Sequence, residues 1–108
     1  MSQFTPYGYD KIRTYFKDTF TFVGVGEGNT EHKRYSAVPS SISGNIISYT
    51  LTIDNVDGSF TGKTLNIAKV YDIGSGGTSG ADATFTNFTF QSVDDVLTLT
   101  IKIEIPTV

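Results

Sequence analysis

Two glycine-rich segments of this chain have the composition of nucleotide-binding loops. The first is Gly58–Thr64, GSFTGKT, which resembles a phosphate-binding loop, where backbone N–H groups and a lysine bind phosphates. It has three residues between its glycines, whereas the motif has four. The motif also needs a helix that begins at the Lys-Thr pair, and here the strand-like segment Leu65–Tyr71 follows. We therefore interpret residues 58–64 as a turn that leads into a strand, with Lys63 in solvent.

The second segment contains Gly24, Gly26 and Gly28 and follows a predicted strand, as a dinucleotide-binding fingerprint would. That fingerprint requires a helix directly after the glycines, inside a strand–helix–strand unit. Residues 27–32 have no helical pattern. We interpret these glycines as a strand-exit turn that uses positive φ angles.

His32 is the single histidine of the chain and lies between Glu31 and Lys33. Zinc sites need several Cys or His ligands at short spacings, and this chain has no cysteine. As a general base, His32 would need a serine or aspartate that no sequence pattern places beside it. We expect a histidine in a solvated surface loop.

Asp54, Asp57, Asp94 and Asp95 offer the hard oxygen atoms that Ca²⁺ prefers. Their spacing is not that of an EF-hand, and aspartate is also a common turn residue because its carboxylate accepts hydrogen bonds from nearby N–H groups. We interpret them as turn residues. The sequence thus predicts no enzymatic activity, no metal site and no cofactor.

A helix is predicted over residues 6–17, with Thr5 as its N-cap and Pro6 at its first position. Apolar residues recur there at spacings of three and four, the period of one helix face: Tyr9, Ile12, Tyr15 and Phe16. The aromatic members of this stripe are expected to cover one open end or face of the sheet structure. The charged residues are expected on the outer side: Asp10, Lys11, Arg13 and Lys17.

Five strands are predicted from alternating apolar residues: Thr19–Val25, Ile47–Ile53, Leu65–Tyr71, Ala83–Phe90 and Val96–Ile105. In the first of them, Phe20 and Phe22 are expected on one face. Leu65–Tyr71 is apolar on both faces, which is typical of a central strand. The alternation shifts between Phe85 and Phe88, which indicates a β-bulge near Asn87.

The connections are predicted from polar and glycine-rich segments. Gly44-Asn45 suits a tight hairpin. Residues 27–43 are mostly polar and irregular, so we expect a surface loop or an extended arm there. Residues 74–81, GSGGTSGA, are expected to form a loop.

The hydroxyl groups of Ser48, Thr50, Thr52, Thr98 and Thr100 line the polar faces of two predicted strands. We interpret these faces as the solvated side of a sheet. A sugar or another subunit bound there is the alternative.

These elements predict one mainly β domain over residues 1–108, an antiparallel β-sandwich with one short N-terminal helix. A chain of 108 residues is the size of one ordinary domain. The expected core consists of Tyr49, Leu51, Ile53, Phe88, Phe90, Leu97, Leu99, Ile101 and Ile103.

The composition indicates which partners and which cellular location to expect. The net charge is −3 and no basic stripe is present, which argues against binding to nucleic acid. No apolar run has the roughly 20 residues that a membrane-spanning helix needs. The N-terminal sequence MSQFTPYGYDK lacks the basic and apolar regions of a signal peptide, so we expect synthesis in a cytoplasm without export by that route.

Several blocks, in order, resemble a family of small bacteriophage tail-fibre-type structural proteins. TPYGYDKIR and TFTFVGVGEGNT resemble the family's T-N-x-G-L-N-x-I-R helix and its Y-I-x-V-G-T-G-T-T segment. SGNIISYTLTID is similar to the V-x-F-x-A-x-F strand, and KTLNIAKVYDIGSGG to I-x-E-I-G-L-F-x-x-x-x-G-G. FTNFTFQSVDDVLTLTIKIEI resembles F-x-x-x-x-K-x-x-x-x-L-T-I-T-W-x-I. The chain departs from the pattern at residues 69–71, KVY in place of Gly-Leu-Phe, and at residues 91–92, where a lysine-containing turn is common.

The resemblance implies a non-enzymatic virion component made in the host cytoplasm, attached to tail, baseplate or fibre. It implies a homo-oligomer that binds other virion proteins. A capsid decoration protein is the alternative, with residues 27–43 as an arm across neighbouring subunits. A module that binds a host-surface glycan or receptor is a further one. The expected contact residues are Glu27, Asn29, His32, Arg34, Tyr35, Ser75 and Thr78.

Overall fold

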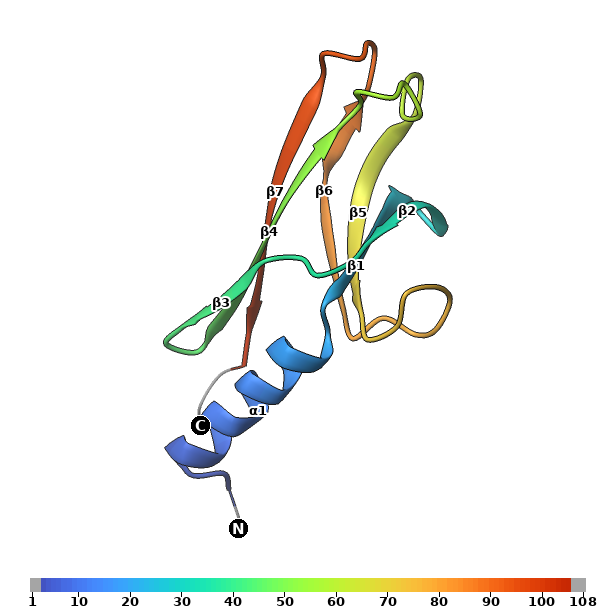
Figure 1. Cartoon of the computed structure of the whole chain (residues 1–108). Coiled ribbons are helices and arrows are strands. Elements are labelled where there is room, and N and C mark those ends of the chain that lie inside the picture. The colour runs from blue at the N-terminus through green and yellow to red at the C-terminus, as the bar shows by residue number, and fades with distance from the viewer. Residues whose placement is uncertain (1–2, 106–108) are drawn as a thin grey trace.

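The computed structural model describes residues 3–105 and contains one helix followed by seven strands (Figure 1). The elements are α1 (Pro6–Thr19), β1 (Phe22–Glu27), β2 (Thr30–Tyr35), β3 (Ser40–Ser43), β4 (Ile46–Asp54), β5 (Thr64–Tyr71), β6 (Ala81–Thr89) and β7 (Val96–Glu104). Every strand pairing is antiparallel. One sheet has the order β2-β1-β5-β6 and the other the order β3-β4-β7. The predicted mainly β class with one N-terminal helix is confirmed.

The pairing of β4 with β7 is the most regular part of the molecule. It runs without a shift from Ile46 opposite Glu104 to Asp54 opposite Val96. On β4, the predicted alternation holds, because Ile47, Tyr49, Leu51 and Ile53 are buried and Thr50 and Thr52 are exposed. On β7, Ile101 is buried, whereas Leu97, Leu99 and Ile103 are partly exposed and pack against the core. The two strands thus supply most of the apolar face of the smaller sheet.

A bulge lies between β5 and β6, where the sequence predicts one. Leu65 is opposite Phe88 and Ile67 is opposite Thr84, so Asn66 alone faces residues 85–87 of β6. The inward side chains change parity there on both strands, from Ala68 to Leu65 and from Phe85 to Phe88. Extra residues on one strand bend it and increase its twist. β5 lies inside its sheet, between β1 and β6, as predicted.

The core lies between the two sheets. Side chains of β1 and β5 line one side of it and those of β4 and β7 the other, and two phenylalanines from the connecting loops fill one end. Fully burying an aliphatic or aromatic side chain of this kind contributes about 1.5–3 kcal/mol. The buried residues are Val23, Val25, Val38, Ile47, Tyr49, Leu51, Ile53, Phe60, Leu65, Ala68, Val70, Phe90 and Ile101.

Residues 27–43 are not the loop or arm that their polar sequence predicted. They contain the last residue of β1, the turn at residues 28–29, and the strands β2 and β3. The chain between β2 and β3 crosses from one sheet to the other, with Val38 buried and its N–H group bonded to the Thr21 carbonyl at 3.1 Å. This crossing closes one side of the sandwich. The Gly44-Asn45 turn between β3 and β4 is confirmed, since Ser43 pairs with Ile46 and Gly44 has a φ of 61°.

Helix α1 lies at one end of the sandwich, next to β3, and its N-terminal part points away from the sheets (Figure 1). Thr5 caps it by accepting a hydrogen bond from the Gly8 N–H group. Tyr9 is buried and Phe16 stacks on Phe20 at a centroid distance of 4.3 Å. Two predictions fail here: Phe20 caps the helix instead of starting a strand, and Tyr15 is 69% exposed. The molecule is elongated, with extents of 53 × 25 × 22 Å.

Candidate functional site

Arg34 joins two segments that the sequence predicted separately as contact loops. Its side chain donates to the Glu31 carboxylate from Nε at 2.7 Å, and to the carbonyls of Ile73 and Gly76 at 2.8 and 3.2 Å. The guanidinium also stacks on the Tyr71 ring, 3.5 Å from its centroid. Strand β2 therefore holds the loop between β5 and β6 in place. Because its donors are taken up by these partners, Arg34 acts as a structural clamp and is not free to bind an anion.

The backbone of β1 leaves room for this clamp because two of its residues lack side chains. A Cβ atom at Gly24 would collide with the Glu31 carboxylate, and one at Gly26 would collide with the Thr30 carbonyl. Both glycines lie inside β1, so they are not the strand-exit turn that was predicted; only Gly28, with a φ of 57°, belongs to the turn. Beside them is a hollow of about 30 Å³, lined in part by Ile67 and Lys69. That volume suits one or two water molecules and is far below the roughly 300 Å³ of a small-molecule site.

Most of the other predicted contact residues lie on the two segments that Arg34 joins. Glu27 and Asn29 are exposed at the β1–β2 turn, and Ser75 and Thr78 are exposed on the loop between β5 and β6. His32 is in strand β2 and partly buried, so the prediction of a solvated loop histidine is wrong.

Tyr35 differs from the other predicted contact residues, because it packs against the core at the end of β2. Burial, and to a smaller extent the negative charges of Asp54 and Asp57, raises the pKa of Tyr35 to about 12. The phenol is uncharged at neutral pH, as an ordinary tyrosine is, and its ring packs against the core.

The segment 58–64 has the structure of a turn that enters a strand. The N–H group of Gly62 donates to the Phe90 carbonyl at 2.8 Å and that of Lys63 to the Phe60 carbonyl at 2.8 Å. Strand β5 begins at Thr64, as predicted. The backbone donors that would bind phosphate in a nucleotide-binding loop are therefore used within the fold.

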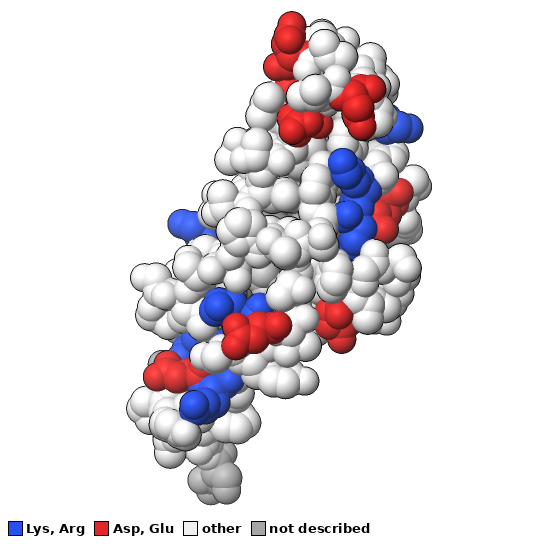
Figure 2. Space-filling model, in the orientation of Figure 1, with Lys and Arg blue, Asp and Glu red and all other residues white. Residues whose placement is uncertain are grey.

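Three of the four candidate calcium ligands accept hydrogen bonds from turn backbone, as turn residues do. Asp54 accepts from Val56 N–H, Asp57 from Ser59 N–H, and Asp95 from Gln91 and Ser92 N–H. The hydrogen bonds from Ser59, first from its backbone and then from its hydroxyl, lower the pKa of Asp57. Acidic side chains gather at the upper end of the molecule (Figure 2). Within residues 3–105, no three Asp, Glu or His side chains are placed to hold a metal ion.

Asn55 connects the loops at this upper end of the molecule, and the sequence patterns did not predict this role. It is fully buried, and its amide nitrogen donates to Thr61 Oγ1 and to the Ser92 carbonyl, both at 2.9 Å. Its amide oxygen accepts from the Phe60 N–H group at 2.8 Å. One side chain thus ties the loop after β4 to the loop before β7. The only signal in the sequence was its position in the turn segment 54–58.

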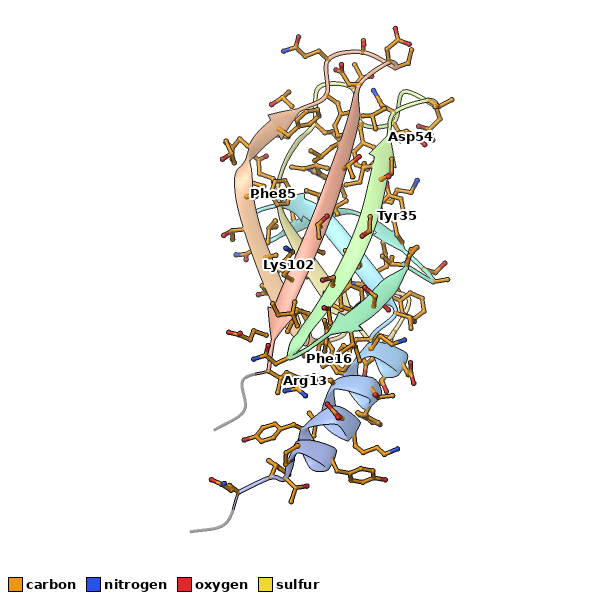
Figure 3. All side chains as sticks on the ribbon, turned by 90° about the vertical axis from the view of Figure 1, so that its left-hand side faces the viewer. Arg13, Phe16, Tyr35, Asp54, Phe85 and Lys102 are labelled. Atoms are coloured by element: carbon orange, nitrogen blue, oxygen red, sulfur yellow. The ribbon has the colours of Figure 1, made fainter. Side chains whose placement is uncertain are left out.

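Arg13 was expected on the outer side of the helix and is instead 3% exposed. Its two terminal nitrogens donate to Asp10 Oδ1 at 3.0 Å and to the Ile105 carbonyl at 2.8 Å. Figure 3 shows Arg13 and Phe16 on the side of α1 that meets the sheets. Arg13 thus connects the helix to Ile105, the residue directly after β7. The helix is therefore attached to the sheets through a buried side chain and its hydrogen bonds.

The outer face of α1 carries exposed aromatic residues. Tyr7 is 71% exposed, with the Lys11 ammonium 5.2 Å from its ring centroid, and Tyr15 lies two turns further along. Phe4, just before the helix, is also exposed. Tyrosine is enriched in protein interfaces because it offers a large apolar surface and a hydrogen-bonding group. This face has the chemistry of a protein-binding surface.

Comparisons of the chain with protein-family models, with curated proteins and with solved structures found no match. None of the helical structure within residues 3–105 has the length and apolar character to cross a membrane. On the face drawn in Figure 2, Lys and Arg residues are interspersed with Asp and Glu along the lower half of the molecule.

Replacing Arg34 with alanine is expected to release the loop of residues 72–80. The variant loses its hydrogen bonds to two loop carbonyls and its contact with Tyr71, which should lower the free energy of unfolding by about 2–4 kcal/mol. Hydrogen exchange of the loop amides, read by mass spectrometry, should speed up more than exchange in β4. Arg34→Lys should behave similarly, because an ammonium cannot reproduce the planar set of donors.

The neighbouring Lys33→Ala is the matched control for this experiment. Lys33 is exposed, and its ammonium lies 4.9 Å from the centroid of the Tyr35 ring. Its removal should change stability by less than about 1 kcal/mol and leave loop exchange unaltered. Equal exchange rates in Arg34→Ala and wild type would contradict the role of Arg34 as a clamp.

Proposed function

We propose that this protein is a non-enzymatic structural component of a bacteriophage virion, attached to the tail, baseplate or fibre, which works by self-association and docking. The observation that carries the proposal is the outer face of α1, a helix whose N-terminal part protrudes from the sheets, where Tyr7 and Tyr15 are 71% and 69% exposed. A second support is the order of sequence blocks that resembles small tail-fibre-type proteins, spread over most of the chain. The two-sheet sandwich with an N-terminal helix is compatible with that resemblance.

A capsid decoration protein is the related alternative. Its specific support was an extended arm over residues 27–43, and those residues form β2 and β3 within the two sheets. The tail assignment is therefore the one that we propose. Labelling of purified particles with a gold-conjugated antibody against the chain tests it directly. Gold at the tail or baseplate is expected; gold over the capsid would favour decoration, and absence of the chain from particles would refute both.

Binding of a host-surface glycan has one observation in its favour. A shallow hollow of about 160 Å³ lies on the outer face of the smaller sheet, lined by Pro39, Ser40, Ser41, Ser48 and Thr50. Hydroxyl groups of this kind can bind the hydroxyls of a sugar, but no aromatic ring lines the hollow. A glycan array probed with the fluorescently labelled protein tests this function, and we expect no specific binding.

The role of the helix face can be tested by the double variant Tyr7→Glu, Tyr15→Glu. Both side chains are exposed, and a glutamate at position 7 would lie one turn before Lys11, a spacing that supports a helix, so the fold should be stable. Incorporation of the variant into particles should fall at least about tenfold, as measured by quantitative blotting of purified virions. Val93→Glu, a similar change at an exposed residue at the other end of the molecule, should be incorporated normally.

A further inference from the structure

The four edge strands of the two sheets differ in how they are protected against pairing with another chain. Exposed edges are usually shortened, charged or bulged, because their free N–H and C=O groups would otherwise pair with a further strand. β3 has only four residues, β2 carries charged side chains and a register shift opposite β1, and β6 contains the bulge at residues 85–87. β7 has nine residues and no register shift, and its charged residues, Lys102 and Glu104, lie near one end. Among the described strands, β7 is the unprotected edge.

The sandwich is also open on the side of β7. The inward side chains of β4 are buried, whereas those of Leu97, Leu99 and Ile103 on β7 are partly exposed. β6 runs alongside β7 without pairing with it, and its Phe85 is likewise only partly buried (Figure 3). The opposite side is closed by the crossing from β2 to β3. An apolar opening thus lies next to a long, regular strand edge.

We propose that a second copy of this chain covers this opening, with β7 of the two copies paired antiparallel about a two-fold axis at Thr100. This register uses all nine residues of the strand. On the inner face it places Leu97 opposite the partner's Ile103, and Leu99 opposite the partner's Ile101. On the outer face it places Thr98 opposite the partner's Lys102, and Thr100 opposite the partner's Thr100. Two three-stranded sheets become one continuous sheet of six strands.

The charges of β7 favour this register over a neighbouring one. A two-fold axis at Lys102 would place two ammonium groups directly opposite each other, which destabilises a strand pair. With the axis at Thr100, no like charges face each other. An axis perpendicular to the sheet also keeps the larger sheets of both copies on the same side. The partly exposed residues of β6 and β7 in the two copies would then cover one another.

A cysteine at position 100 tests the geometry, because the natural chain contains no cysteine. In Thr100→Cys, two copies of the new side chain lie opposite each other at a Cα distance of about 5 Å, within the range of a disulfide. Mild oxidation should convert most of the protein into a covalent dimer. The control is Thr52→Cys, since Thr52 is an exposed threonine on β4 that faces the same side of the sheet. It would be more than about 14 Å from its counterpart, since three strand spacings separate the two copies of β4, and should not cross-link.

A pair of charge variants tests the register. Thr98→Glu would face the partner's Lys102 twice per dimer, whereas Thr98→Lys would create two like-charge contacts. We expect the dissociation constant of the dimer, from analytical ultracentrifugation, to be at least about tenfold lower for Thr98→Glu than for Thr98→Lys. Thr98 is exposed and outward-facing, so both variants should fold.

The inference deepens the proposed function, since it gives self-association a defined surface and rests on that proposal for its biological role. A wild-type protein that stays monomeric at high micromolar concentration would overturn the dimer, as would equal cross-linking of the two cysteine variants or equal affinities of the two charge variants. None of these results bears on whether the chain is found in particles, which antibody labelling decides separately.

Discussion

Asn55→Ala is expected to lower the free energy of unfolding by about 3 kcal/mol or more, a large part of the roughly 5–15 kcal/mol typical of a domain. The asparagine amide makes three hydrogen bonds from a fully buried position. Its removal leaves the N–H group of Phe60 buried without an acceptor, and leaves a cavity beside Phe60. A buried donor without a partner costs about 1–3 kcal/mol. The same change separates the loops that Asn55 joins.

Urea unfolding followed by circular dichroism measures this loss. Asn29→Ala is the matched control, because Asn29 is exposed in the β1–β2 turn and should change stability by less than about 0.5 kcal/mol. Asn55→Asp keeps the acceptor for the Phe60 N–H group but loses both donors, so it should destabilise the protein as well. Near-wild-type stability of Asn55→Ala would mean that the loops at this end do not depend on the amide.

The β4–β7 pair of the smaller sheet was predictable from sequence, unlike β3, because each of these two strands has a regular alternation of apolar and polar residues. In Ile46–Asp54 every second residue is apolar, and only a strand with one face in the core places all of them inside. The bulge in β6 was predictable for the same reason, since Phe85 and Phe88 can both face inward only if the strand has extra residues between them. Patterns of this kind give both the strand and its inner face.

Strand β2 shows where such reasoning fails. Its sequence, TEHKRY, has no apolar alternation. On its outer face Glu31 and Arg34 bond to each other, and on its inner face Tyr35 is the residue that packs against the core. Pairing with β1 and the contacts of Arg34 with residues 73 and 76 make it a strand. The available signal was the Gly28-Asn29 turn between two segments of similar length. Polar edge strands are stabilised by residues distant in sequence. A local pattern of apolar residues therefore does not predict them.

Arg13 and Asn55 illustrate the same limit for buried polar residues. Arg13 donates to the carbonyl of Ile105, which is 92 positions away, and Asn55 to that of Ser92, which is 37 positions away. Local rules place an arginine on the wet side of a helix and an asparagine in a turn, and both rules describe the backbone correctly here. Burial of their side chains follows from the packing of distant segments. Likewise, the clamp at Arg34 was not predictable, because it bonds to loop residues 73 and 76, which are distant in sequence.

Stability is expected to fall steeply above pH 10. Burial raises the pKa of Tyr49 from the ordinary value of 10 to about 12. The pKa of Tyr35 is also raised to about 12, mainly by burial. Between pH 10 and pH 12 the folded protein keeps protons that the unfolded chain has lost, so the free energy of unfolding decreases as pH rises. The contribution is complete below pH 10 and is lost as pH rises through 12. A shift of this size corresponds to about 3 kcal/mol for Tyr49, and Tyr35, which is partly exposed, should contribute less.

Phenylalanine variants separate the two tyrosines in this effect. Tyr49→Phe loses the hydrogen bond from the phenol to the Phe20 carbonyl, 2.8 Å long, and should be about 1 kcal/mol less stable at neutral pH. Between pH 10 and pH 12 it should lose less stability than wild type, so the two unfolding curves should converge. The double variant Tyr35→Phe, Tyr49→Phe should be nearly insensitive to pH in this window. A wild-type slope in the double variant would assign the alkaline transition to other groups, because the ionisation of a buried phenol is the only link between these two positions and pH.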